Sequence, residues 1–220
     1  MGLSSVRAEE TPAAETPRCP GVQAWYQAHP EQKAGAVARR DRGRVHGDPA
    51  LADALARRVA QDQRARTLWL ANPHQRGYAM DVSAVDADDL RWLKALVRER
   101  GLPTAAQVGE AGVHAAWLLI QHADADPAFQ AEVLPALAQR HADGELDGND
   151  LARLTDRVLL AQHQPQRYGT QFAQQDWHAA HFRLPDDAAG FDRQRAALGL
   201  MPLADYVCMM NRAFTLHTAP

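Results

Sequence analysis

Residues 104–127 read TAAQVGEAGVHAAWLLIQHADADP, and this stretch decides the fold class. Val113, Trp117 and Ile120 recur at the three- and four-residue spacing of one helix face, which predicts a helix from about residue 104 to 122. Asp126-Pro127 then forms a typical helix start, with Asp as the N-cap and Pro at the first helical position. One helix therefore ends and the next begins within a few residues.

The same signals recur on both sides of this stretch. Asp48-Pro49 opens a helix whose apolar row begins at Leu51 and Leu55 and which ends before ANPHQRG. Pro135 predicts a kink or a nearby break in the helix that starts at Pro127. No alternating strand pattern is found, so we predict an all-α fold, a single compact bundle of about five to seven helices. The further helices are expected at about 86–100, 127–144 and 149–162, in a short segment that ends at Gly199, and from Pro202 onward.

The N-terminal segment predicts a disordered leader. Residues 1–20, MGLSSVRAEETPAAETPRCP, are rich in Glu, Pro, Ala and Thr and lack an apolar signal core. We therefore expect residues 1–30 to be leader and linker and residues 48–210 to be the helical domain. Cys19 and Cys208 form a bridge in an exported protein or stay as two unrelated thiols in a cytosolic one. A periplasmic or exported location is the expectation, with a cytoplasmic one as the alternative.

Composition excludes several function classes. The 220 residues carry a net charge of −3 and 46% hydrophobic residues, typical of a soluble protein and unfavourable for nucleic-acid binding. No apolar run is long enough to span a membrane. Ser83 is the single serine beyond the leader, which argues against a serine hydrolase. Lys33 and Lys94 are the only lysines, and no glycine-rich nucleotide motif occurs, so no cofactor is expected.

Two stretches resemble metal-binding motifs without matching them. The acids of DGELDGND, residues 143–150, fall at offsets that an EF-hand loop does not use. DWHAAH, residues 176–181, lacks the HExxH pattern, and its histidines are read as surface residues. We assign no metal ligand.

His122 is the strongest candidate for acid–base chemistry. It ends one predicted helix, and Asp124 and Asp126 lie in the corner before the next. An imidazole beside carboxylates can act as a general base. The alternative is structural, with Asp126 as a helix cap and His122 packed or bonded to a carbonyl. Asp156-Arg157 lies inside a later helix, where one of the two charges is expected to be half-buried and to need a partner. A structural ion-pair network is therefore an equally open interpretation of these two residues.

In combination, these stretches resemble a bacterial family of domains of unknown function. The motifs are DQxxR at Asp62, QHAD at Gln121, DR at Asp156 and QxYGTQ at Gln166, followed by RAALGLMPLADY, and the resemblance covers roughly residues 50–207. The resemblance implies no established activity, and some members of the family carry signal peptides. It does imply which polar residues act together: Asp62, Gln63, Arg66, Gln121, His122, Asp124, Asp156, Arg157, Gln166, Tyr168, Gly169, Thr170 and Gln171.

The loop QHQPQRYGTQF, residues 162–172, has two interpretations. It folds over a pocket between helices, with Gly169 permitting a positive φ or a close backbone approach and with Tyr168, Thr170 and Gln171 as ligand-binding groups. Alternatively, its amides bond helix termini and hold the bundle together.

The leading hypothesis is an enzyme, a hydrolase or transferase, acting on a polar small-molecule or peptide-like substrate. His122 would be the acid or base, oriented by Asp124, with Asp156 as a second carboxylate and Arg157 or Arg66 as an anion clamp. The alternative is a non-catalytic protein of the cell envelope that binds a ligand or a partner protein with the same residues.

Overall fold

The computed structural model describes residues 19–32, 41, 46–172 and 187–218. Most of the predicted leader, the basic stretch 33–40 and the histidines of DWHAAH lie outside the described residues. In the described part the chain forms helices and no strands. The predicted all-α class is thus confirmed.

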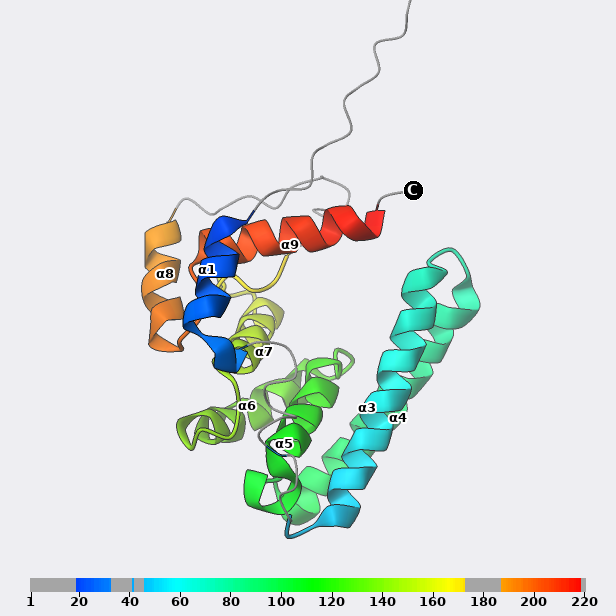
Figure 1. Ribbon diagram of the computed structural model, residues 1–220. Coiled ribbons are helices and arrows are strands. Elements are labelled where there is room, and N and C mark those ends of the chain that lie inside the picture. Colours follow the sequence, from blue (N-terminus) through cyan, green and yellow to red (C-terminus); the bar gives the residue numbers. More distant parts are fainter. Residues whose placement is uncertain (1–18, 33–40, 42–45, 173–186, 219–220) are drawn as a thin grey trace, which may run out of the picture.

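A long antiparallel hairpin forms one side of the molecule (Figure 1). It consists of α3 (Pro49–Ala71) and α4 (Arg76–Arg100), and α3 packs against both α4 and α5 (Ala105–Gln121). Asp48 starts α3 as predicted, because its side chain accepts a hydrogen bond from the Leu51 N–H at 2.9 Å. α4 begins ten residues before the predicted start at residue 86, since its first turns lack the apolar periodicity that marks a buried helix.

α5 is interrupted at Gly109, where φ is +75°. The backbone N–H groups of Glu110 and Ala111 restart the helix and donate to Asp41 at 3.1 and 2.5 Å. Asp41, which is distant in sequence, thus caps the N-terminus of the part of α5 that follows Gly109.

α6 (Pro127–Ala142) and α7 (Gly148–Ala161) pack against each other beside α5. Asp126 caps α6 as predicted, accepting from the Phe129 N–H at 3.0 Å. α6 continues through Pro135 without a break. Together α3 to α7 bury one apolar core, with Leu55, Ile120 and Leu154 fully inaccessible to solvent.

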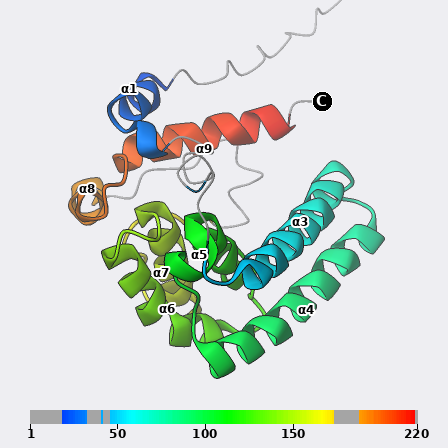
Figure 2. The same cartoon turned by 60° about the horizontal axis from the view of Figure 1, so that its bottom comes forward.

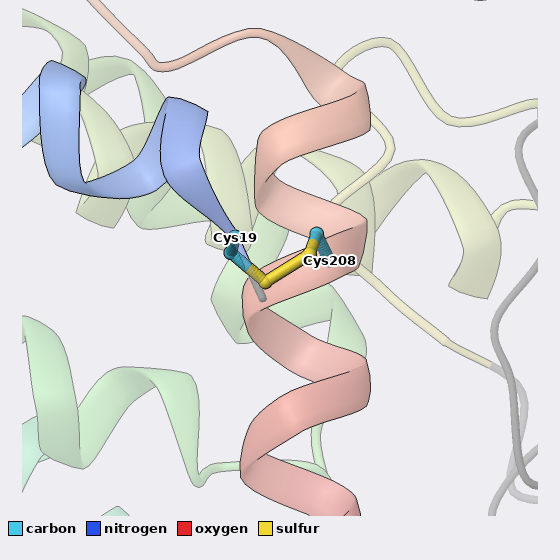
Figure 3. Close-up of a disulfide and its surroundings, with 2 residues drawn as sticks. All are labelled: Cys19 and Cys208. Atoms are coloured by element: carbon cyan, nitrogen blue, oxygen red, sulfur yellow. A yellow bond between two sulfur atoms is a disulfide. The ribbon is translucent and has the colours of Figure 1, made fainter. Parts of the chain in front are cut away.

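The third part of the fold joins both ends of the described chain. α8 (Ala188–Ala197) and α1 (Pro20–Ala28) pack on α9 (Leu203–Thr218), which crosses above α5 to α7 in both views (Figures 1 and 2). A disulfide between Cys19 and Cys208 ties the start of α1 to α9 (Figure 3). α1 falls inside the predicted leader, and it is ordered because Trp25 and Tyr26 pack on the apolar side of α9.

Among the described residues, no helix is both long enough and apolar enough to cross a membrane.

Candidate functional site

The first group of motif residues lies where α3 meets the C-terminal end of α5. Asp62, on α3, is 1% exposed. Its Oδ1 lies 2.9 Å from Nδ1 of His122, the C-cap residue of α5, and its Oδ2 accepts from Gln63 Nε2 at 2.7 Å. The carboxylate that contacts His122 is therefore Asp62, and Asp124 does not take that place.

The protonation of this pair follows from its surroundings. Burial raises the pKa of Asp62, but the hydrogen bond and the charge of His122 and the charge of Arg66 outweigh it and hold that pKa below its ordinary value. An ionised carboxylate only accepts hydrogen bonds, so the His122 Nδ1–H donates to it. In the neutral ring, Nε2 is then the nitrogen with a free lone pair, and the side chain is 18% exposed.

Arg66 connects this pair to α4. Its Nε donates to Asp62 Oδ1 at 3.0 Å and lies 3.1 Å from His122 Nδ1, while its Nη2 donates to Asp86 Oδ1 at 2.6 Å. Burial raises the pKa of Asp86 even though Arg66 lowers it. The guanidinium thus contacts all three of the other groups.

Asp62, Asp86 and His122 each offer one atom of the kind that binds a metal, and these atoms lie within 4.8 Å of one another. The Arg66 guanidinium already supplies the positive charge at that position. A divalent ion would have to displace it, so the residues do not fit a metal as they stand.

Arg157, on α7, forms the second group. Its Nη1 donates to the Gln121 backbone carbonyl at 2.8 Å and pairs with Asp124. The Gln121 side-chain oxygen, turned toward the guanidinium, accepts from Nε and Nη2 at 2.9 and 3.1 Å. Because Asp124 is occupied here and its side chain is 67% exposed, it cannot orient His122.

Asp156 and the QRYGTQ loop form the third group. The Asp156 carboxylate is fully buried. It accepts from the backbone N–H groups of Arg167, Tyr168 and Thr170 at 2.7, 2.9 and 2.8 Å, and from the Thr170 hydroxyl at 2.8 Å. Both oxygens are used to hold the loop on α7, which favours the scaffold interpretation of this loop over a role as a second catalytic carboxylate.

The remaining loop residues support the same interpretation. The Gln166 side chain bonds the Gln171 backbone twice: its Nε2 donates to the Gln171 carbonyl and its Oε1 accepts from the Gln171 N–H, both at 2.8 Å. Gln171 Nε2 also donates to the Arg153 carbonyl at 3.1 Å, so it closes the end of the loop onto α7. Gly169 has φ +66°, as predicted.

Arg195, on α8, holds the loop from the other side. It is fully buried, and it donates to the carbonyls of Tyr168 and Met201 at 2.7 Å each. Its guanidinium lies 4.7 Å from the ring centre of Tyr206. Burial lowers the pKa of Arg195. Tyr168 is itself 8% exposed and packs with Ala152 on α7 and with Leu200, in the connection between α8 and α9.

A comparison with known protein families identifies the family of the chain. Residues 49–219 match the model of a family described as a family of unknown function, DUF6624. The chain belongs to this family. No curated protein and no solved structure matches it. The resemblance stated from the motifs is thereby confirmed, and the matched region includes every polar residue that the motifs identified.

Asp86 and Arg195 belong to these groups of this DUF6624 chain, although no sequence motif predicted their roles. Asp86 lies in the polar first half of α4, where no spacing indicates contact with Arg66. Arg195 is the first residue of RAALGL, a stretch that is part of the family resemblance. The motif therefore includes Arg195, but it does not indicate that this side chain is buried.

A hollow in the described part of the chain lies away from these motifs. A cavity of about 390 Å³ opens between α5, the α6–α7 connection and the short 3₁₀ helix η1 (Pro30–Gln32). His114 lines it, and its Nδ1 lies 2.6 Å from Oδ2 of the buried Asp150. The DUF6624 chain thus carries a second histidine–aspartate pair, between α5 and α7.

Proposed function

We propose that this DUF6624 protein is an enzyme, a hydrolase or transferase, that acts on a polar small-molecule or peptide-like substrate by acid–base chemistry. The observation that carries the proposal is the contact between His122 Nδ1 and the buried Asp62 carboxylate. A buried carboxylate on one ring nitrogen fixes the orientation and tautomer of the imidazole and leaves the other nitrogen to move a proton.

In this scheme His122 Nε2 takes the proton from a water or hydroxyl nucleophile and returns it to the leaving group. Asp62 stabilises the imidazolium that forms in between. Arg66 already bridges Asp62 and Asp86, and among the described residues its Nη1 has no partner. We assign to that nitrogen the binding of a substrate oxyanion or carboxylate.

We further propose an exported or periplasmic location. The Cys19–Cys208 disulfide supports it, because such bonds persist in oxidising compartments and are rare in the cytosol.

The second candidate is a non-catalytic binding protein of the cell envelope. It is favoured by the saturation of Asp156, Gln166 and Gln171, whose hydrogen bonds all go to the chain itself. On this alternative the motifs build the fold, and recognition uses other surfaces.

The test compares thermal unfolding of the wild type, His122→Gln and His74→Gln, each with and without a metabolite library. His74 is an exposed histidine in the α3–α4 turn and serves as the matched control. A compound that raises the midpoint of the wild type and of His74→Gln, but not of a folded His122→Gln, binds at His122 and enters an activity screen. Catalysis by His122 requires turnover of that compound by the wild type and a loss of about 10²–10⁴-fold in the variant. Ligand binding without turnover, or with turnover unchanged in His122→Gln, contradicts the enzyme proposal.

A further inference from the structure

The cavity beside His114 carries an inference independent of the proposed His122 site. Its walls come from α5, from the end of α6 and its connection to α7, and from η1. Its volume of about 390 Å³ is within the range of small-molecule sites. Its lining carries the carboxylates Glu31, Glu110, Glu145, Asp147 and Asp150 beside His114.

The His114 ring is held in one orientation. Its Nδ1 bonds to Asp150, whose side chain is 9% exposed, and its ring stacks on the buried Trp117 with centroids 5.1 Å apart. Since Nδ1 is engaged, Nε2 is the ring nitrogen left for a ligand. The ring is 45% exposed, so a ligand in the cavity can reach it.

The lining of the cavity is acidic. Among the described residues no lysine or arginine lines it, while carboxylates come from three separate segments of the chain. Glu145 forms an ion pair with Arg140 at 3.2 Å, and one carboxylate oxygen of Asp147 caps α7. Glu31 has no ion pair with any described residue. A ligand that carries positive charge is therefore favoured over a neutral or anionic one.

The spacing of these carboxylates argues against a bare metal ion. Within the described residues, the one group of side chains that converges closely enough for a metal is Asp62, Asp86 and His122, at the C-terminal end of α5. The carboxylates around the cavity are spread over its walls instead, which suits a cation with several N–H donors that reach different walls.

We propose that this cavity binds a small organic cation with N–H donors, an alkylammonium or guanidinium compound. Glu31 and Asp147 accept from its cationic nitrogens, and His114 Nε2, held by Asp150, accepts a further N–H in the neutral ring. Recognition uses charge-assisted hydrogen bonds and is independent of whether His122 is catalytic.

The experiment is isothermal titration calorimetry of the full chain, at a pH high enough for the His114 ring to be neutral, with 1,4-diaminobutane, agmatine, 1,4-butanediol and MgCl₂. We expect saturable binding of at least one of the two amines and no binding of the diol. Glu31→Gln and His114→Gln each weaken it about tenfold, the factor for one lost charge-assisted hydrogen bond. Asp88→Asn, which removes an exposed carboxylate from α4, serves as the matched control and leaves the affinity unchanged.

Three results overturn the proposal. The first is no binding of either amine to the wild type. The second is an equal loss of affinity in Asp88→Asn and in the cavity variants, which indicates non-specific charge attraction. The third is Mg²⁺ binding that Glu31→Gln abolishes while the amines do not compete for it, which makes the cavity a metal site. Glu31 lies on η1, outside the core of α3 to α7, so Glu31→Gln tests the site without disturbing that core.

Discussion

His122 Nδ1 lies 2.9 Å from Asp62 Oδ1, although 60 residues separate the two in sequence, and this contact joins the end of α5 to α3. It makes Asp62 a positioning residue for the imidazole. The lowered pKa of Asp62, set by burial against the stronger effects of His122 and Arg66, keeps the carboxylate ionised and the ring proton on Nδ1.

Asp62→Asn is expected to change the tautomer of His122. The asparagine amide can donate to Nδ1, which moves the ring proton to Nε2 and removes the lone pair that abstracts protons. Ring ¹⁵N chemical shifts measure this directly, and the activity found by the screen should fall about 10²–10⁴-fold. Asp124→Asn is the control, because Asp124 pairs with Arg157. A tautomer that stays the same in Asp62→Asn, or that changes equally in Asp124→Asn, contradicts this role.

The sequence predicted the helices around this site better than the contacts between their side chains. Helix starts at Asp48 and Asp126 are local signals, since a capping carboxylate and its partner N–H lie three residues apart. Asp124 was chosen as the partner of His122 because it is close in sequence. The pairing with Asp62 depends on how α3 crosses α5, which no local spacing encodes.

Burial was the other property that the sequence did not show. From the sequence, one of Asp156 and Arg157 is expected to be half-buried and to need a partner. In the structure the Asp156 carboxylate accepts hydrogen bonds from backbone N–H groups of the loop. Backbone N–H groups do not depend on residue type, so no sequence motif marks them as partners. For the same reason Trp25 and Tyr26 were not recognised as a packing face, since α9 lies almost the whole chain length away.

Asp156→Asn is expected to destabilise the fold by at least about 3 kcal/mol. The change removes a buried charge that accepts four hydrogen bonds and turns an amide donor toward N–H groups. Urea unfolding followed by circular dichroism gives the free energy of unfolding. Asp143→Asn, at an exposed position after α6, controls for the substitution itself. Equal stability of the two variants would show that the loop is not held by Asp156.

Removal of the disulfide is expected to release α1. Cys19 and Cys208 are 189 residues apart, so the bond constrains the unfolded chain strongly and contributes up to about 5 kcal/mol in the chain-entropy model. In Cys19→Ala/Cys208→Ala, hydrogen exchange should rise in residues 20–28 and much less in α5, because the α3–α7 core is separate. The wild type with and without dithiothreitol provides the matched comparison. Uniform exchange across α1 and α5 would contradict this order of stability.

The His114–Asp150 pair predicts a pH dependence. Burial lowers the pKa of His114, but the hydrogen bond and the charge of Asp150 raise that pKa by more than burial lowers it. The pKa of His114 therefore lies above the ordinary 6.5. Folding therefore favours the protonated ring. The stability from this pair is fully present below pH 6.5 and is lost as pH rises through the folded-state pKa. Urea unfolding over this range should show the difference between wild type and His114→Gln shrinking as pH rises, and NMR titration of Asp150→Asn should give a lower His114 pKa. A difference that grows with pH would reverse the assignment.

Gly169→Ala is expected to lower the free energy of unfolding by about 1–2 kcal/mol. Gly169 has φ +66°, in the left-handed region where a Cβ is strained, and that Cβ would lie 3.0 Å from Leu203 Cδ1. Gly77→Ala in α4 is the matched control: a Cβ there meets nothing within 4 Å, and alanine is the better helix former, so this variant should be neutral or stabilised by up to about 1 kcal/mol. Both are measured by urea unfolding. The opposite signs separate strain in the loop from a general effect of replacing glycine, and a Gly169→Ala protein as stable as Gly77→Ala would show that the QRYGTQ loop does not need this backbone conformation.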